Sequence, residues 1–260
     1  MRHRIIPILL LKNNGLYKGI HFKDHKYVGD PINAVKIFND KEVDELVFLD
    51  INASSEQKEP NYNILRDIAS ECFMPLAYGG GVSSLEMIKE ILRVGIEKVV
   101  LNSHAVRNPK FVQEAVRYFG SSTIVVSIDA KKSFWGNNYN VYINSGKEKT
   151  NLQAVEWAIE LEKMGVGEII VNSIDKDGTL SGYDVNLIRG IVDVVKIPVI
   201  AAGGGSSLTD FVKICKHHKA SASAAGAYFV FQGKHNAVLI TYPTQVEIEK
   251  EFDSFVEVIK

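Results

Sequence analysis

Cysteine, long apolar runs and an excess of charge of one sign are all scarce in this chain. It has two cysteines, Cys72 and Cys215, among 260 residues, which excludes a disulfide framework and a cysteine-based metal site. The net charge of -1 makes nucleic acid and anionic membranes poor partners, so any bound anion must be held locally. The first apolar run, residues 5–11, is shorter than the ~20 residues of a membrane span. We therefore expect a cytoplasmic protein with no membrane segment, metal or cofactor.

Strand-like and helix-like segments alternate along nearly the whole chain. The expected strands are residues 5–11, 46–51, 75–78, 98–102, 123–129, 168–172, 198–201 and 221–225. The expected helices are residues 31–41, 62–72, 84–94, 109–118, 152–164, 185–195, 208–217 and 243–259. A polar loop follows the first strand, and residues 140–143 are expected to form a hairpin arm. Eight repeats of strand and helix predict a (β/α)8 TIM barrel in one domain, residues 1–260.

An internal repeat divides this barrel into two half-barrels, about residues 1–120 and 121–260. The segments that begin at Pro75 and Pro198 both run from an apolar strand into three glycines and two serines, and the prolines are 123 positions apart. Glycines before a helix N-terminus let the backbone approach an anion closely. The duplicated turn predicts a ligand with a phosphate at each end. The alternative is that the glycines only make tight turns.

Asp129 ends the apolar run Ile124-Val-Val-Ser-Ile-Asp-Ala-Lys131, which is typical of a buried strand. Catalytic groups of parallel barrels lie at the C-terminal ends of the strands. Asp129 is therefore expected to point into a site.

Four segments together resemble the cyclase subunit of imidazole glycerol phosphate synthase, the HisF family. They are residues 44–51, 79–81, 126–131 and 173–183, and the resemblance extends from about Arg4 to Phe231. It implies a barrel of two half-barrels that takes ammonia from a HisH-like glutaminase subunit docked on its N-terminal face. It also implies that the barrel splits and cyclises a ribonucleotide with two phosphates, without a cofactor.

Residue by residue, Asp129 corresponds to one of the family's two catalytic aspartates, but the other position holds Leu10. The internal repeat agrees, since residues 5–10 align with residues 124–129. Ring closure with lysis needs one group to donate a proton and another to accept one. Leucine can do neither, so cyclase activity of the chain alone is doubtful.

Other positions of the family's active face are retained in part. Those that line the face are Lys18, Asp50, Asp177 and Thr179, and the phosphate positions are Gly81, Asn102 and Ser103 for one site and Gly178, Gly204 and Gly226 for the other. Ala202 and Ala227 replace serines of the second site. The alternative for Asp50 and Asp177 is that they cap a helix or turn.

Four charged residues at strand starts, Arg4, Glu45, Lys98 and Glu168, alternate in sign around the predicted barrel. They are expected to pair into a ring at its N-terminal end. All four match the salt-bridge gate through which ammonia enters the family's barrel.

Three functions remain open. The first, which we favour, resembles the paralogues found with surface-polysaccharide (lipopolysaccharide) genes, which pass ammonia to a sugar amidotransferase that makes an acetamidino sugar. The second is the cyclase of histidine biosynthesis, and the third is a non-catalytic scaffold that activates the glutaminase. Residues 232–243 form an apolar, β-like insertion, either a decorated loop or cover for a partner surface.

Overall fold

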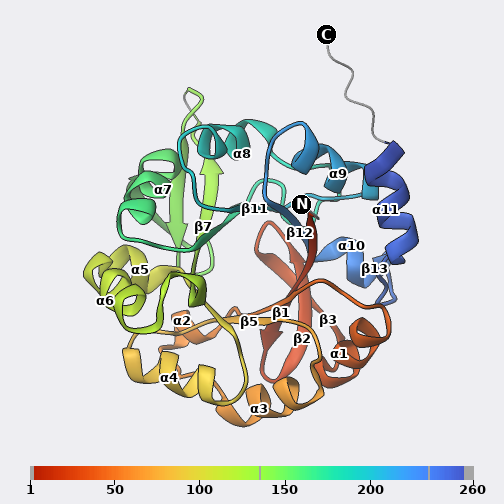
Figure 1. Ribbon diagram of the computed structural model, residues 1–260, viewed down its shortest axis with the longest axis horizontal. Helices are drawn as coiled ribbons and strands as arrows, with labels where there is room; N and C mark the ends of the chain where they lie inside the picture. The colour runs from red at the N-terminus through yellow and green to blue at the C-terminus, as the bar shows by residue number, and fades with distance from the viewer. Residues whose placement is uncertain (1–2, 135, 234, 255–260) are drawn as a thin grey trace.

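A closed ring of eight parallel strands forms the centre of the computed structural model, which describes residues 3–134, 136–233 and 235–254. The strands are β1 (Arg4–Lys12), β4 (Leu46–Asp50), β5 (Leu76–Gly79), β6 (Lys98–Leu101), β7 (Ile124–Lys132), β10 (Glu168–Ser173), β11 (Val199–Ala202) and β12 (Ala222–Ala225). They follow one another around the ring in chain order, and the pairings of β6 with β7 and of β12 with β1 join the two halves (Figure 1). The predicted (β/α)8 barrel is confirmed.

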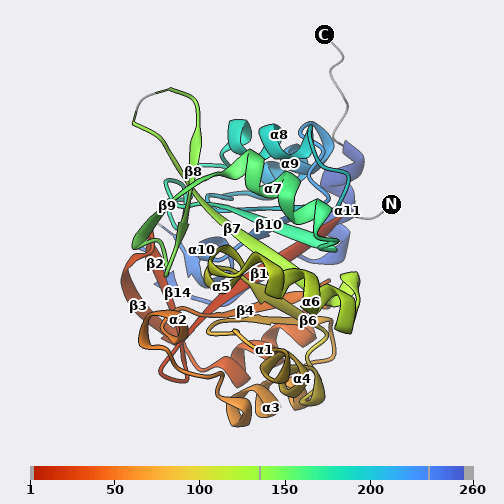
Figure 2. The same cartoon turned by 90° about the vertical axis from the view of Figure 1, so that its left-hand side faces the viewer.

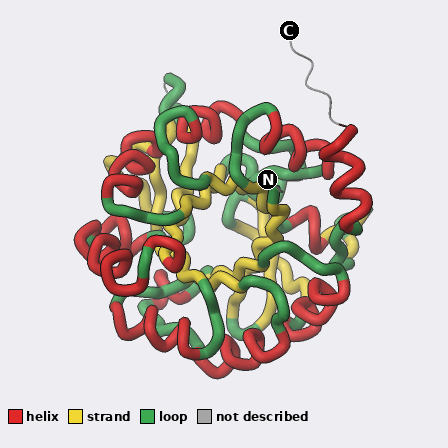
Figure 3. The backbone as a smooth tube through the Cα atoms, in the orientation of Figure 1, coloured by secondary structure: helices red, strands yellow, loops and turns green. Residues whose placement is uncertain are grey.

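Helices surround the barrel, as the tube drawing shows (Figure 3). The longer ones are α1 (Pro31–Asp40), α3 (Tyr62–Glu71), α4 (Leu85–Arg93), α6 (Pro109–Phe119), α7 (Ala154–Lys163), α8 (Val185–Val192), α9 (Leu208–Lys216) and α11 (Gln245–Ser254). The shorter ones are α2 (Ala53–Glu56), α5 (Ser103–Arg107), η1 (Ser121–Thr123) and α10 (Ala227–Val230). The last helix was predicted to span residues 243–259, but it begins at Gln245, and residues 255–259 lie outside the described residues.

Strand side chains alternate between two apolar layers, because successive residues of a strand point to opposite faces. On β1, Ile5 and Leu9 belong to the layer between strands and helices, whereas Ile6 and Ile8 belong to the layer inside the barrel. Both layers are buried, which explains why the barrel strands are continuous apolar runs. The inner layer contains several alanines, so the barrel interior is filled by small and branched side chains.

The two half-barrels pair their strands in the same register. Each pair of residues that face each other on neighbouring strands of the first half has an equivalent pair in the second half. The equivalent residues lie 119, 123 or 124 positions apart in the sequence, depending on the strand. The corresponding pairs are Leu10–Leu49 and Asp129–Asn172, Leu46–Leu76 and Ile169–Val199, Ala77–Lys98 and Ile200–Ala222, and Val99–Ile124 and Ser223–Ile5. Leu10 and Asp129 are thus equivalent positions of the backbone.

Hairpins follow the first strand of each half. A polar loop was expected after β1, because scattered glycines suggested irregular structure there. The structure instead has an antiparallel hairpin of strands β2 (Gly15–Ile20) and β3 (Lys23–Gly29). In the second half, β8 (Tyr139–Ile143) pairs with β7 and with β9 (Glu148–Gln153). Figure 2 shows β7 and β8 continuing beyond the barrel. Both hairpins lie at the end of the barrel where the parallel strands end, here called the mouth.

The insertion after α10 is only in part a strand. The short strands β13 (Phe231–Gln232) and β14 (Ala237–Val238) pair with each other. The Tyr242 ring stacks on Phe229, and its hydroxyl donates to the carbonyl oxygen of Ile5 at 2.9 Å. Leu239 to Tyr242 were expected to be β-like, but they do not form a strand; the N–H groups of Leu239 and Thr241 bond instead to the carbonyl oxygens of Val230 and Phe229 at 3.0 and 2.9 Å.

Candidate functional site

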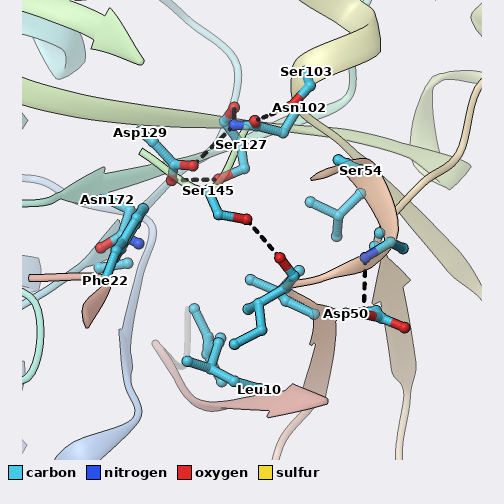
Figure 4. Close-up of a pocket in the computed structure, with 18 of the residues that line it drawn as sticks. Leu10, Phe22, Asp50, Ser54, Asn102, Ser103, Ser127, Asp129, Ser145 and Asn172 are labelled. Carbon is cyan, nitrogen blue, oxygen red and sulfur yellow. Dashed lines mark hydrogen bonds between the residues drawn. The ribbon is translucent and has the colours of Figure 1, made fainter. Parts of the chain in front are cut away.

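A cavity of about 390 Å³ occupies the mouth of the barrel. Its deep walls are inner-layer residues such as Ile8, Val100 and Ala224, and its rim comes from the loops after the strands. Most of the polar residues singled out in the sequence line this cavity, because the C-terminal ends of all eight strands meet there. Figure 4 shows the side chains that face one another across it.

Asp129 projects from β7 into the cavity wall. Its carboxylate accepts hydrogen bonds from the Asn102 amide at 3.1 Å and from the Ser127 hydroxyl at 3.4 Å. Burial, followed by the negative charge of Asp177, raises the pKa of Asp129 to about 7, although hydrogen bonds from Ser127, Asn172 and Asn102 oppose the shift. Such a carboxyl group exchanges a proton near neutral pH, as a general acid or base must.

Leu10 lies across the cavity from Asp129 (Figure 4). The backbone position is equivalent to that of Asp129, but the side chain contributes only apolar surface, together with Leu49 beside it on β4. Leu10 and Leu49 therefore form an apolar part of the cavity wall, opposite the polar part that Asp129 and Asn172 form on β7 and β10. Among the described residues that line it, no second carboxylate stands where Leu10 is.

Lys18 and Asp177 form a buried ion pair at the cavity. The ammonium group of Lys18 donates to one oxygen of Asp177 at 2.7 Å, and the residues are 5% and 8% exposed. The other oxygen of Asp177 is buried without a hydrogen-bond partner. The structure thus brings together two residues that are 159 positions apart and leaves one buried oxygen of Asp177 without a partner.

Asp50 and Thr179 make local contacts. One oxygen of Asp50 accepts the N–H groups of Asn52 and Ala53 at 3.0 and 3.1 Å, so it caps the turn before α2, as the alternative interpretation expected. Burial raises the pKa of Asp50. Thr179 lies outside the residues that line the cavity, because its hydroxyl bonds within its own loop to the Lys176 carbonyl oxygen and Ser181.

The predicted phosphate residues gather at two sites on the rim, here called cup 1 (Gly81, Asn102 and Ser103) and cup 2 (Gly178, Gly204 and Gly226). All six line the cavity. Gly81, Gly178 and Gly204 have positive φ angles, and an added Cβ would lie 2.2–2.5 Å from backbone oxygens of neighbouring loops. These glycines are therefore required by the packing of the loops, whatever they bind.

The helix ends at the cups differ from the expectation. We expected the helices after the glycine turns, α4 and α9, to offer free N–H groups, but Ser84 and Ser207 cap them with their own hydroxyl oxygens at 3.2 and 3.1 Å. The short helices α5 and α10 start without a side-chain cap. The uncapped backbone at each cup therefore belongs to the short helix after the next strand, α5 after β6 and α10 after β12.

Sequence reasoning missed some residues of the cavity. Phe22 lies at the tip of the β2–β3 hairpin and lines the cavity (Figure 4), and the backbone N–H of the neighbouring His21 donates to the carbonyl oxygen of Asp177 at 2.9 Å. No local signal marks Phe22, because the hairpin itself was not expected. His104 and Arg107, the second and fifth residues of α5, also line the cavity. This short helix was not expected from the sequence, so nothing singled out these two residues.

Arg4, Glu45, Lys98 and Glu168 form a closed ring of ion pairs at the opposite end of the barrel. Arg4 bonds to both glutamates, and Lys98 lies 2.8 Å from Glu45 and 3.1 Å from Glu168. The carboxylates are the inner members, with side chains 3% and 9% exposed against 21% for Lys98 and 29% for Arg4. Burial disfavours the charge on Arg4, but the bonds and charges of both glutamates outweigh it and raise its pKa.

The described residues show neither a metal cluster nor a membrane helix. No group of three or more His, Cys, Asp and Glu side chains among them is arranged to hold a metal ion. None of their helices is both long and apolar enough to cross a bilayer.

Known proteins are similar to this chain over most of its length. A family model described as histidine biosynthesis protein matches residues 4–236. A relative in Pseudomonas aeruginosa, provisionally named imidazole glycerol phosphate synthase subunit hisF2, is 49% identical over 243 residues, which cover 94% of this chain and 96% of that protein. A relative in Leptospira borgpetersenii, provisionally named as subunit HisF, is 46% identical over 97% of this chain and 99% of its own.

A third relative bears the enzyme name without that qualification. Imidazole glycerol phosphate synthase subunit HisF of Clostridium botulinum is 43% identical over 226 residues, which cover 87% of this chain and 89% of that protein. The matches span almost the whole barrel, both half-barrels included. The chain therefore belongs to the histidine biosynthesis protein family and is a HisF-like member of it.

Proposed function

We propose that this barrel receives ammonia from a HisH-like glutaminase subunit on its N-terminal face and passes it through its interior. The ammonia would leave at the mouth for a sugar amidotransferase that makes an acetamidino sugar of a surface polysaccharide, in the cytoplasm. The observation that carries the proposal is the closed ring of Arg4, Glu45, Lys98 and Glu168, which lies on the barrel axis and faces an apolar interior.

The interior suits neutral ammonia better than ammonium. Between the ring and the cavity the barrel is filled by apolar side chains that are 0–3% exposed: Ile6, Val47, Ala77, Val125, Ile170, Ile200 and Ala222. An ion crossing this layer would lose its hydration without gaining a partner, whereas a small neutral molecule pays far less. Alanines on β5 and β12 leave the least side-chain bulk there. Ammonia that passes the ring therefore emerges beside Asp129 and Ser127.

The N-terminal face also has apolar residues suited to a partner. Phe73, Tyr118 and Val194 lie at or near the helix ends that lead into β5, β7 and β11, and they are 87%, 70% and 44% exposed. All three lie at the end of the barrel that carries the ring. Large exposed side chains around a charged centre are typical of a protein interface with a polar component.

The second candidate is the cyclase of histidine biosynthesis. Asp129, with a pKa raised to about 7, supports it, as does the similarity to the Clostridium botulinum subunit. Leu10 weighs against it, because loss of one acid or base commonly costs a factor of about 10² to 10⁴ in rate. The purified chain, given ammonium and the family's ribonucleotide substrate, should show little turnover; robust turnover would establish the cyclase instead.

Ammonia transfer can be tested separately from chemistry at the mouth. In a complex of the chain, the glutaminase and the sugar amidotransferase, ¹⁵N should enter the sugar from amide-labelled glutamine and also from free ¹⁵N-ammonium. Lys98→Met should reduce incorporation from glutamine and leave incorporation from ammonium unchanged. Lys89→Met, at an exposed ion pair on α4, is the matched control. Equal incorporation from glutamine in both variants would favour a scaffold that only activates the glutaminase.

A further inference from the structure

The two half-barrels differ in how their first two strands meet at the N-terminal end. In the second half the register of β7 with β10 begins at Val125. In the first half the register of β1 with β4 begins at Ile8, two residues after Ile6, which is the equivalent of Val125. The start of β1, from Arg4 to Pro7, therefore precedes its register with β4, and this stretch beside β4 is here called the open seam.

Side chains bridge the open seam. The N–H of Ile5 donates to a carboxylate oxygen of Asp44 at 3.1 Å, and the carbonyl oxygen of Ile5 accepts the hydroxyl of Tyr242 at 2.9 Å. In the second half the carbonyl oxygen of the equivalent Ile124 accepts the backbone N–H of Gly167 at 3.3 Å. A tyrosine from the far end of the chain thus supplies, in the first half, the donor that the backbone supplies in the second.

Tyr242 is itself held firmly in place. It is 2% exposed, and its ring stacks on that of Phe229, which is fully buried, with the ring centroids 5.3 Å apart. The backbone before it is also fixed, because the N–H of Thr241 donates to the carbonyl oxygen of Phe229 at 2.9 Å. The hydroxyl lies 3.5 Å from the same oxygen of Asp44 that accepts the N–H of Ile5. A packed ring directs this hydroxyl to one position, where it is part of a buried polar network.

The residues that Tyr242 contacts are chain neighbours of two members of the charged ring. Ile5 follows Arg4, and Asp44 precedes Glu45. Arg4 and Glu45 form an ion pair across the open seam. The Arg4 side chain is 29% exposed, more than those of the other three members, so burial confines it least. Contacts to the backbone beside Arg4 are therefore what fix its position.

We propose that Tyr242 is a positioning residue for Arg4 and Glu45, and that the insertion, residues 232–243, brings its hydroxyl to the open seam. The inference rests on the proposed function in taking the ring as the ammonia entrance. It gives the insertion a role within this chain, whereas the sequence suggested a decorated loop or cover for a partner surface. The hydroxyl is the essential group, because the stacked ring alone offers no donor to Ile5.

Tyr242→Phe removes this hydroxyl and keeps the ring on Phe229. In a chain labelled with ¹⁵N-arginine, solvent exchange of the Arg4 guanidinium protons, followed by NMR, should become about fivefold faster, the usual net effect of one hydrogen bond. Tyr183→Phe is the matched control, because its buried hydroxyl donates to the carbonyl oxygen of Ala224 at 3.0 Å, at the mouth. Circular dichroism checks that both variants fold. Equal exchange of the Arg4 protons in the two variants would overturn the proposal.

The complex with the glutaminase and the sugar amidotransferase measures the consequence for ammonia. For each glutamine hydrolysed, less ¹⁵N should reach the sugar with Tyr242→Phe than with Tyr183→Phe, while incorporation from free ¹⁵N-ammonium is equal. If Lys98→Met lowers transfer from glutamine and Tyr242→Phe does not, the positioning role is overturned and the ammonia entrance stands. Faster exchange at Arg4, with transfer that neither Lys98→Met nor Tyr242→Phe changes, would support the positioning role and overturn the entrance.

Discussion

The two half-barrels share a backbone and differ in chemistry. Strand pairing repeats in the same register, yet Leu10 and Leu49 face Asp129 and Asn172 across the cavity. At the phosphate cups the asymmetry is reversed, since the first half has the polar side chains. Register is set by backbone pairing and by the outer apolar layer, which both halves must keep to fold. Inward-facing residues at the mouth are free of that requirement, so this is where the halves diverge.

The N-terminal end is symmetric in part. Glu45 and Glu168 are equivalent residues of the two halves, whereas both cations of the ring, Arg4 and Lys98, come from the first half. Each glutamate contacts both cations. The ring is therefore a feature of the whole barrel that neither half can form alone, in contrast to the cups, which each half builds by itself.

The largest effect is expected from removing one glutamate of the ring. Glu45→Ala and Glu168→Ala should each lower the free energy of unfolding by about 3–5 kcal/mol, because two cations would be left at a largely buried site with one carboxylate. Urea unfolding of both variants gives the values. Glu86→Ala, at an exposed pair on α4, should change stability by less than about 0.5 kcal/mol. A loss below 1 kcal/mol for both ring variants, on the order of an exposed pair, would contradict the burial argument.

The next effect is the pH dependence of Asp129. Its pKa is raised from 3.8 to about 7 in the folded chain, so folding is not penalised below pH 3.8. As the pH rises from 3.8 to 7, the unfolded chain releases this proton while the folded chain keeps it, so the free energy of unfolding falls. Above pH 7 both states are ionised at Asp129, and its contribution no longer changes with pH. Asp129→Asn should therefore gain about 4 kcal/mol in unfolding free energy, relative to wild type, between pH 4 and pH 8. The pH-independent part of the substitution cancels in this comparison.

Urea unfolding at pH 4, 5, 6, 7 and 8 measures that gain. Asp67→Asn, at an exposed position of α3, is the matched control. A difference between Asp129→Asn and wild type that stays constant over this range would show that Asp129 ionises freely in the folded chain.

Leu10→Asp tests whether the two halves can be made chemically alike. The new carboxylate would replace apolar contacts beside Leu49 and face Asp129 across the cavity, at an expected cost of about 2 kcal/mol. It should also raise formation of imidazole glycerol phosphate from ammonium and the ribonucleotide. Leu10→Asn, of the same shape without the charge, should raise no activity. Equal activity in the two variants would mean that the missing acid is not what limits the cyclase reaction.

The smallest effect compares the two capped helices. Ser84→Ala and Ser207→Ala should each cost about 1 kcal/mol, because each hydroxyl satisfies one N–H of its helix at nearly the same distance. Thermal unfolding of both variants is the measurement. Unequal losses would show that Asp210, which binds Ser206 in the second half alone, also supports that cap.

The sequence predicted the fold because strand and helix periodicity are local properties, and the repeat at Pro75 and Pro198 fixed the equivalence of the halves. It also predicted that Leu10 stands at the position equivalent to Asp129. It did not predict the hairpin after β1, whose residues 15–29 carry no clear alternation. As a result Phe22 was missed, since a side chain at a hairpin tip reaches a site only through the geometry of the hairpin.

Other properties were decided by tertiary structure alone. Lys18 and Asp177 become a buried pair, and Arg107 meets Glu148, because closure of the barrel brings distant loops together. Whether Asp50 reacts or caps depends on which N–H groups the turn presents. By itself the sequence determined the barrel, its twofold repeat and the types of residue at each strand end. The tertiary structure decided which of these residues pair with one another as ion pairs or hydrogen bonds. Such pairing depends on distances in space, which cannot be read from separations along the sequence.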